Sequence, residues 1–196
     1  MKIGLDVDGV LADSMPIVND FYNRRFGSNF KLFDYQYYDL EKTWGGTKQN
    51  AAKIIEYLFF SPYWNLVPPV DYSQEGIDII SKENNLIAIT SRPISIHEKT
   101  QRFIKEYFGD KIREIVSTGQ YASLATNISK SDICISRGIE LLIEDCFEVA
   151  LDCAQKGISV FLLDYPWNQL NGFSANSLPD NFHRVSNWKE IMEKLT

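Results

Sequence analysis

The chain opens on KIGLDVDGVL, residues 2–11, in which a short apolar run leads into two carboxylates and a glycine. The apolar run predicts a buried strand that ends before Gly9. Asp6 and Asp8 share one face if the strand continues, whereas Asp8 leans over the strand end if the chain bends at Gly9. In both cases two acids crowd the carboxyl edge of a strand, where open α/β sheets bind ligands. Because a cation or a proton relieves such a pair, the pattern favours a Mg²⁺-dependent phosphoryl-transfer site over an ordinary polar turn.

The composition bounds the class of protein. The chain has 196 residues, 44% of them hydrophobic and 23% charged, which suits one core domain with a modest insertion. A net charge of −6 argues against a nucleic-acid polymer or an anionic membrane as partner, since both reward basic patches. The three cysteines cannot all pair, so free thiols in a reducing compartment are expected. With Met1 leading straight into the first strand, we expect a cytoplasmic protein. Its oligomeric state stays open, with a homodimer among the alternatives.

Strands and helices alternate from Ser73 onward. We expect strands at residues 86–89, 114–117, 141–143 and 158–163, with helices between them, one of which opens on a capping box from Ser95 to Glu98. A polar loop over residues 165–180 leads to a last helix near Asn187. This order predicts an α/β fold with a parallel sheet and helices on both faces.

Residues 28–69 differ in character, because aromatic residues are dense there and no strand-like run separates them. Thr47 is placed to cap a helix that ends at Ser61. We therefore expect residues 15–72 to form a small helical cap inserted after the first strand, with residues 1–14 and 73–196 as the core. Most of the aromatic residues are expected to build the cap's own core rather than a ligand platform.

The sequence Asp-x-Asp-Gly-Val after an apolar strand resembles the first motif of the haloacid dehalogenase-like (HAD) phosphohydrolases. The longer run DVDGVLAD, residues 6–13, is similar to the 5′(3′)-deoxyribonucleotidase branch and to uncharacterised nucleotidases near it. The resemblance implies a Rossmann-like parallel sheet, a helical cap and three further motifs.

Candidates for all three motifs occur in the expected order. Thr90 and Ser91 follow the second strand, where a hydroxyl and a backbone N–H can hold a phosphate oxygen. Lys130 stands near the start of a helix, and the resemblance gives it the role of neutralising the nucleophile and the phosphate. Glu144 and Asp145 follow the fourth strand, and we expect Asp145 to bind Mg²⁺, with Glu144 behind it or as an alternate ligand.

The resemblance also implies a mechanism. Asp6 attacks phosphorus and forms an aspartyl-phosphate, while Asp8 protonates the leaving alkoxide and then activates water. Mg²⁺ lies between the carboxylates of Asp6 and Asp145 and the backbone carbonyl of Asp8. The expected substrate is a small phosphomonoester, foremost a nucleoside 5′-monophosphate.

Several alternatives remain at this stage. Deoxyribonucleotidases carry a base-stacking aromatic where this chain has Ser14, so the base must be recognised differently. A sugar-phosphate phosphatase or a phosphomutase would use the same site. A non-catalytic phosphate- or metal-binding module would have no need of Asp8. Arg92 could meet a phosphate or form a surface ion pair.

Overall fold

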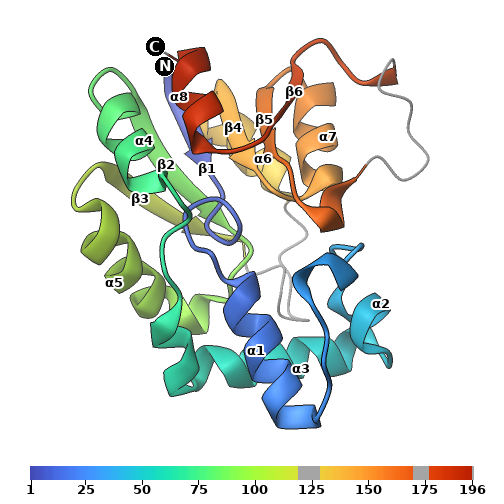
Figure 1. The fold of residues 1–196 in the computed structure, drawn as a ribbon. Helices are drawn as coiled ribbons and strands as arrows, with labels where there is room; N and C mark the ends of the chain where they lie inside the picture. The colour runs from blue at the N-terminus through green and yellow to red at the C-terminus, as the bar shows by residue number, and fades with distance from the viewer. Residues whose placement is uncertain (119–128, 170–176, 196) are drawn as a thin grey trace.

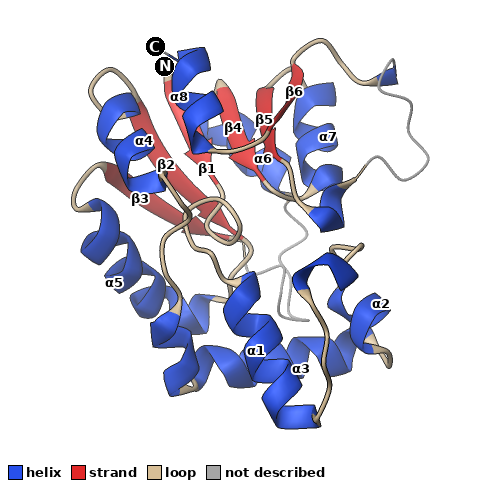
Figure 2. Ribbon diagram, in the orientation of Figure 1, coloured by secondary structure: helices blue, strands red, loops and turns tan. Residues whose placement is uncertain are grey.

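The computed structural model describes residues 1–118, 129–169 and 177–195. The strands of this part of the chain form one parallel sheet in the order β3-β2-β1-β4-β5-β6 (Figure 2). They are β1 (Lys2–Leu5), β2 (Asn85–Thr90), β3 (Ile112–Ser117), β4 (Leu141–Glu144), β5 (Ser159–Leu163) and β6 (Phe182–Val185). The strand order reverses between β1 and β4, and such a switch point is where α/β sheets bind ligands.

Helices cover both faces of the sheet, which confirms the fold expected from the sequence (Figure 1). One face carries α4 (Ser73–Ile80), α5 (His97–Phe108) and α8 (Trp188–Leu195), and the other carries α6 (Lys130–Arg137) and α7 (Phe147–Gln155). Strand β2 contributes side chains to both faces of the sheet, because Leu86 and Ala88 pack into one core while Ile87 and Ile89 pack into the other. None of the helices described here is long and apolar enough to cross a membrane.

Residues 15–72 lie beyond the carboxyl edge of the sheet (Figure 1). They contain α1 (Met15–Phe26), α2 (Leu40–Trp44), α3 (Lys48–Phe60) and the short 3₁₀ helices η1 (Leu32–Asp34) and η2 (Pro62–Leu66). Their aromatic rings pack together, as in the stacked pair Tyr22 and Trp44 with centroids 4.1 Å apart. Backbone hydrogen bonds from Asp13 to Pro68 and from Val70 to Leu11 hold the two connecting segments side by side.

Two local features differ from expectation. Within the expected polar loop, residues 170–176 lie outside the described residues. Between that loop and the last helix lies a sixth strand, β6, that was not expected; it pairs with β5 and has only Phe182 and Val185 buried. Two apolar residues in a four-residue segment are too weak a pattern to separate a strand from a loop. The capping box at Ser95 is also absent, because a 3₁₀ turn over Ile94–Ile96 comes first and α5 begins at His97 without a side-chain cap.

Helix α8 packs closely on α4. The indole of Trp188 is fully buried and donates a hydrogen bond to the Val10 carbonyl at 2.8 Å, in the loop after β1. A Cβ placed on Gly76 would lie 2.4 Å from Cε3 and 2.9 Å from Cζ3 of this ring. The absence of a side chain at Gly76 therefore lets Trp188 support the loop that carries Asp8.

We predict that Gly76→Ala destabilises the protein. Alanine favours a helix by about 1 kcal/mol over glycine, but overpacking a core costs about 1–3 kcal/mol. Urea denaturation should show a net loss, whereas Glu75→Ala, on the exposed face of the same helix, should change stability by less than about 1 kcal/mol. An unchanged or raised midpoint for Gly76→Ala would contradict the packing described here.

Candidate active site

A buried lysine joins two of the predicted site residues. Asp6 follows β1, Glu144 ends β4, and Lys130 is the first residue of α6, whose N-terminus is capped by the Ser129 hydroxyl. The Lys130 ammonium lies 2.7 Å from Asp6 Oδ1 and 2.8 Å from Glu144 Oε2. All three side chains are buried. Residues far apart in the sequence thus meet at the carboxyl edge of the central strands.

Asp145 and Glu144 are held differently. Glu144 Oε1 accepts the backbone N–H groups of Asp145 and Cys146, so both of its oxygens have protein partners. Asp145 Oδ2 accepts the indole N–H of Trp167 at 3.0 Å. Its Oδ1 is buried and has no hydrogen-bond partner among the residues described. A buried oxygen without a partner is costly. Asp145 therefore has one oxygen available to bind a ligand, whereas both oxygens of Glu144 already have partners.

The charges in this cluster do not balance. Asp6, Glu144 and Asp145 each bring an oxygen within 4.8 Å of the others, and Lys130 supplies one positive charge. Burial raises the pKa of Asp6 to about 7, although Lys130 opposes the shift, and burial followed by the charge of Asp6 raises the pKa of Asp145. Burial disfavours the Lys130 ammonium, but the two carboxylates outweigh it and raise its pKa. A site of hard oxygen ligands with excess negative charge fits a divalent cation such as Mg²⁺.

The loop after β1 bends at Gly9, whose φ is 77°, so the chain does not continue as a strand. A Cβ on Gly9 would lie 2.3 Å from Asp145 Oδ2, which means that only glycine lets this loop approach Asp145 so closely. Asp8 therefore leans over the strand end, and its side chain is 32% exposed.

Arg92 forms an ion pair, but not at the surface, which was one of the two alternatives considered for it from sequence. Its side chain is 2% exposed and its guanidinium pairs with both carboxylate oxygens of Asp8. The expected surface ion pair is thus wrong, because the pair lies inside the site. The residue follows Thr90 and Ser91, and its backbone N–H donates to the Thr90 hydroxyl at 3.2 Å.

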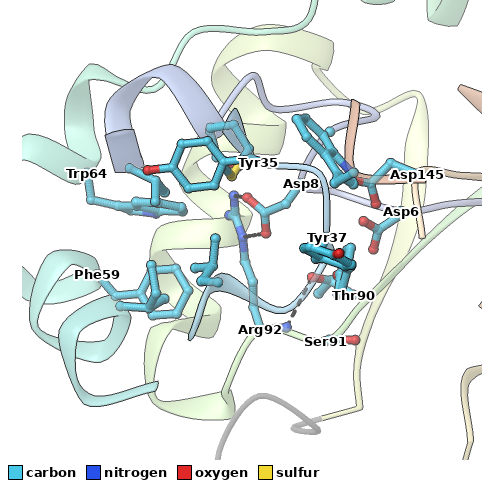
Figure 3. A pocket seen from close by; sticks show the side chains of 18 residues that line it. Asp6, Asp8, Tyr35, Tyr37, Phe59, Trp64, Thr90, Ser91, Arg92 and Asp145 are labelled. Atoms are coloured by element: carbon cyan, nitrogen blue, oxygen red, sulfur yellow. Dashed lines mark hydrogen bonds and ion pairs between the residues drawn. The ribbon is translucent and has the colours of Figure 1, made fainter. Parts of the chain in front are cut away.

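Five of the predicted site residues line one pocket of about 760 Å³, a volume that includes its open mouth (Figure 3). Lys130 and Glu144 are not part of its wall. One end is polar, with Asp6, Asp8, Thr90, Ser91, Arg92 and Asp145 in its wall. The rest of the wall consists of apolar and aromatic side chains from residues 15–72, namely Met15, Val18, Tyr35, Tyr37, Tyr38, Leu40, Ile55, Phe59 and Trp64. Trp64, Phe59 and Tyr35 lie at the end away from Asp6, whereas Tyr37 lies beside Asp6 and Thr90 (Figure 3). Ser14 also lines the pocket. Several aromatic residues expected in the cap's own core therefore border the cavity.

The loop after β5 contributes residues that sequence reasoning missed. Tyr165 donates to the Gly9 carbonyl at 2.8 Å, and Asn168 donates to the Asp145 carbonyl at 2.7 Å. Trp167 stacks on Tyr165 with centroids 4.3 Å apart while its indole N–H binds Asp145. Because this loop follows a parallel strand, it must emerge at the same edge as Asp6 and Asp145, and that rule could have identified it.

Comparison with family models gives one match. It covers residues 1–195 and is described as "5′ nucleotidase, deoxy (Pyrimidine), cytosolic type C protein". No protein with a curated description matches the chain significantly.

Solved structures share the fold. A haloacid dehalogenase-like hydrolase from Streptococcus pneumoniae matches with a TM-score of 0.72 at 14% identity, covering 100% of this chain and 98% of that one. A predicted phosphatase from Clostridium acetobutylicum matches at 0.70 and 14% identity, covering 99% and 97%. An L-2-haloacid dehalogenase from Xanthobacter autotrophicus matches at 0.63 and 11% identity, covering 98% and 96%. At such low identity the likeness shows the fold alone.

The raised pKa of Asp6 predicts a pH-dependent cost in stability. Between its ordinary value of 3.8 and about 7, the folded state keeps a proton that the unfolded state has lost, so stability falls as the pH rises through this window. Asp6→Asn removes this loss. In EDTA, the variant should gain more than about 1 kcal/mol over the wild type between pH 5 and pH 8, measured by urea denaturation.

Asp180→Asn, at an exposed position, serves as the control and should show no comparable gain. A pH-independent difference between Asp6→Asn and the wild type would contradict the charge imbalance of the cluster.

Proposed function

Because the chain belongs to the cytosolic type C 5′-nucleotidase (deoxy, pyrimidine) family of HAD-like hydrolases, we propose that it is a Mg²⁺-dependent phosphatase of nucleoside 5′-monophosphates. One observation carries the proposal. Asp6, held by Lys130, opens into the same pocket as Asp8, Thr90 and Asp145. The residues proposed as nucleophile, acid–base group, phosphate ligand and metal ligand thus share one cavity.

Asp6 is the proposed nucleophile. One of its carboxylate oxygens bonds to phosphorus as the bond from phosphorus to the ester oxygen breaks, which leaves an aspartyl-phosphate and an alkoxide. Lys130 holds Asp6 Oδ1 at 2.7 Å, so it fixes the carboxylate and offsets charge as the phosphoryl group arrives. Thr90 and Ser91, at the pocket wall, are the proposed ligands of the non-bridging phosphate oxygens.

Asp8 is the proposed acid and base. In the first step it gives a proton to the leaving alkoxide, which departs as the alcohol. In the second step it takes a proton from water as the water oxygen attacks phosphorus, which releases inorganic phosphate and restores Asp6. A haloacid dehalogenation would need no second acid of this kind.

The residues that would hold Mg²⁺ are the carboxylates of Asp6 and Asp145 and the backbone carbonyl of Asp8. The unpartnered Oδ1 of Asp145 supports this assignment. Both oxygens of Glu144 instead accept hydrogen bonds, from Lys130 and from the backbone. When bound there, Mg²⁺ would reduce the repulsion between the Asp6 carboxylate and the phosphate dianion.

The proposed substrate follows from the two ends of the pocket. A phosphate suits the polar end, and a flat, partly apolar base suits the aromatic end formed by residues 15–72, which we propose as the cap domain. Tyr38 is 39% exposed as a whole residue. Desolvation of its phenol and the charge of Asp145 raise its pKa, so the phenol stays protonated and offers an O–H near the carboxylates. Tyr38 is thus a cap residue that reaches toward the phosphate end.

The test is phosphate release from a panel of nucleoside 5′-monophosphates and sugar phosphates with Mg²⁺. We predict the highest kcat/KM for a nucleotide and no activity in EDTA. Asp6→Asn should lose all but a trace of turnover, because an amide cannot form the acyl phosphate. The exposed Asp180→Asn should keep full activity. Preference for a sugar phosphate would overturn the substrate class, and an active Asp6→Asn would overturn the nucleophile.

A second prediction concerns Trp167. Its N–H orients Asp145, and residues that orient metal ligands typically contribute about 10–100-fold to metal affinity. Trp167→Phe should therefore raise the Mg²⁺ concentration for half-maximal activity about 10-fold, with kcat restored at saturating Mg²⁺. Trp44→Phe, which removes an indole bonded to Tyr35 instead, should leave the Mg²⁺ requirement unchanged. Equal Mg²⁺ requirements in Trp167→Phe and the wild type would contradict the assignment.

A further inference from the structure

Arg92 grips Asp8 at two points (Figure 3). Its Nε lies 2.7 Å from Asp8 Oδ2 and its Nη2 lies 2.8 Å from Asp8 Oδ1. The remaining nitrogen, Nη1, donates to the Thr100 hydroxyl at 3.2 Å. Every guanidinium nitrogen therefore has a protein acceptor, which leaves this group poorly placed to bind a substrate phosphate through its fork.

The arginine is the fixed partner of the pair. Its guanidinium lies over the Trp64 ring at 4.9 Å from the centroid and 6.0 Å from the centroid of Phe103. Its side chain is 2% exposed, against 32% for the Asp8 side chain. A planar guanidinium close to two rings and bonded at each nitrogen has little freedom, so the position of Arg92 dictates that of the Asp8 carboxylate.

We propose that Arg92 is a positioning residue for Asp8: it fixes the plane of the carboxyl group that transfers protons in the reaction. This inference rests on the role proposed above for Asp8. A carboxylate has about four lone-pair sites, so a fork that uses one on each oxygen leaves others to accept a proton from water. Arg92 thus orients Asp8 for the step in which water is activated.

Trp64, whose ring lies beside the Arg92 guanidinium, connects Arg92 to the proposed cap. Trp64 lies in η2, and its ring meets Phe59 of α3 edge-on with centroids 4.6 Å apart. Both rings also line the apolar end of the pocket. The residues that would contact the substrate's organic group therefore also support the guanidinium that orients Asp8.

The test is a double-mutant cycle on the steady-state kcat for 4-nitrophenyl phosphate, with Arg92→Met, Asp8→Asn and the double variant. Asp8→Asn should cost about 10²–10⁴-fold. Arg92→Met should cost about 10²-fold, as a small misplacement of a reacting group does, with KM changed less than about 3-fold. In the Asp8→Asn background, Arg92→Met should cost almost nothing more, because its partner is already disabled.

Two kinetic outcomes would overturn the proposal. If Arg92→Met lowers kcat by the same factor in both backgrounds, Arg92 does not act through Asp8. If it mainly raises KM, Arg92 binds the phosphate directly. Arg92→Lys keeps the charge but not the fork, so it should recover only a small part of the loss. Arg102→Met, at an exposed position on α5, should behave as the wild type does.

Thr100→Val, with Thr100→Ser as its matched control, provides a milder variant if Arg92→Met does not fold. It removes the hydroxyl that holds Nη1, so kcat should fall in Thr100→Val and be retained in Thr100→Ser. Equal kcat values in the two would count against the proposal.

A crystal structure of substrate-free Arg92→Met gives a readout that needs no activity. The Asp8 carboxylate should leave its wild-type position or occupy several rotamers. An unmoved Asp8 would overturn the proposal even in an active enzyme. A wild-type protein that hydrolyses no phosphate ester would instead refute the proposed function, and the crystal comparison would still decide whether Arg92 positions Asp8.

Discussion

The buried bridge from Lys130 to Asp6 and Glu144 is the interaction on which the site depends. Breaking a buried ion pair by removing one partner is costly, because it leaves an uncompensated charge. Here one ammonium pairs with two carboxyl groups, while a third, that of Asp145, lies close by. The cluster therefore has fewer cationic than acidic groups, and this imbalance supports the proposal that it holds a cation.

The fold brings these charges together through its topology. Strands β1 and β4 are neighbours only because the chain crosses over at the centre of the sheet, and the Asp6 N–H donates to the Ile143 carbonyl across that seam. Helix α6 begins at the same edge and delivers Lys130. On the far side of Asp6, Arg92 joins Asp8 to Trp64. Asp6 therefore lies between the buried charges of Lys130 and Glu144 and the pocket that Trp64 lines.

Much of this arrangement could be predicted from the sequence because it depends on strand ends. Apolar runs locate β1, β2 and β4, and parallel strands carry their following residues to a common edge. A single lysine predicts almost nothing about function, so Lys130 could be identified only by its position at the start of the helix before β4. Its partnership with Glu144 lay beyond prediction, since two adjacent acids look alike in sequence until their hydrogen bonds are known.

The parts that escaped prediction depend on long-range packing. The inward position of Arg92 depends on Trp64 and Phe103, whose rings lie close to its guanidinium although both residues are distant in sequence. Trp167 acts through a hydrogen bond to a residue 22 positions away. Strand β6 forms because it can pair with the edge of β5. The four residues of β6 are too weakly apolar to predict a strand from sequence.

The most direct test of the account is calorimetric titration of Mg²⁺ into the metal-free protein near pH 7, in two buffers with different ionisation enthalpies. Since burial raises the pKa of Asp6 to about 7, and metal ligands must bind deprotonated, binding should release a fraction of a proton that declines at higher pH. Asp6→Asn should lose the part of this release that comes from Asp6, and so should release less than the wild type. Absence of binding, or binding with the same heat in both buffers, would contradict the claim that an unbalanced buried carboxylate cluster forms the metal site.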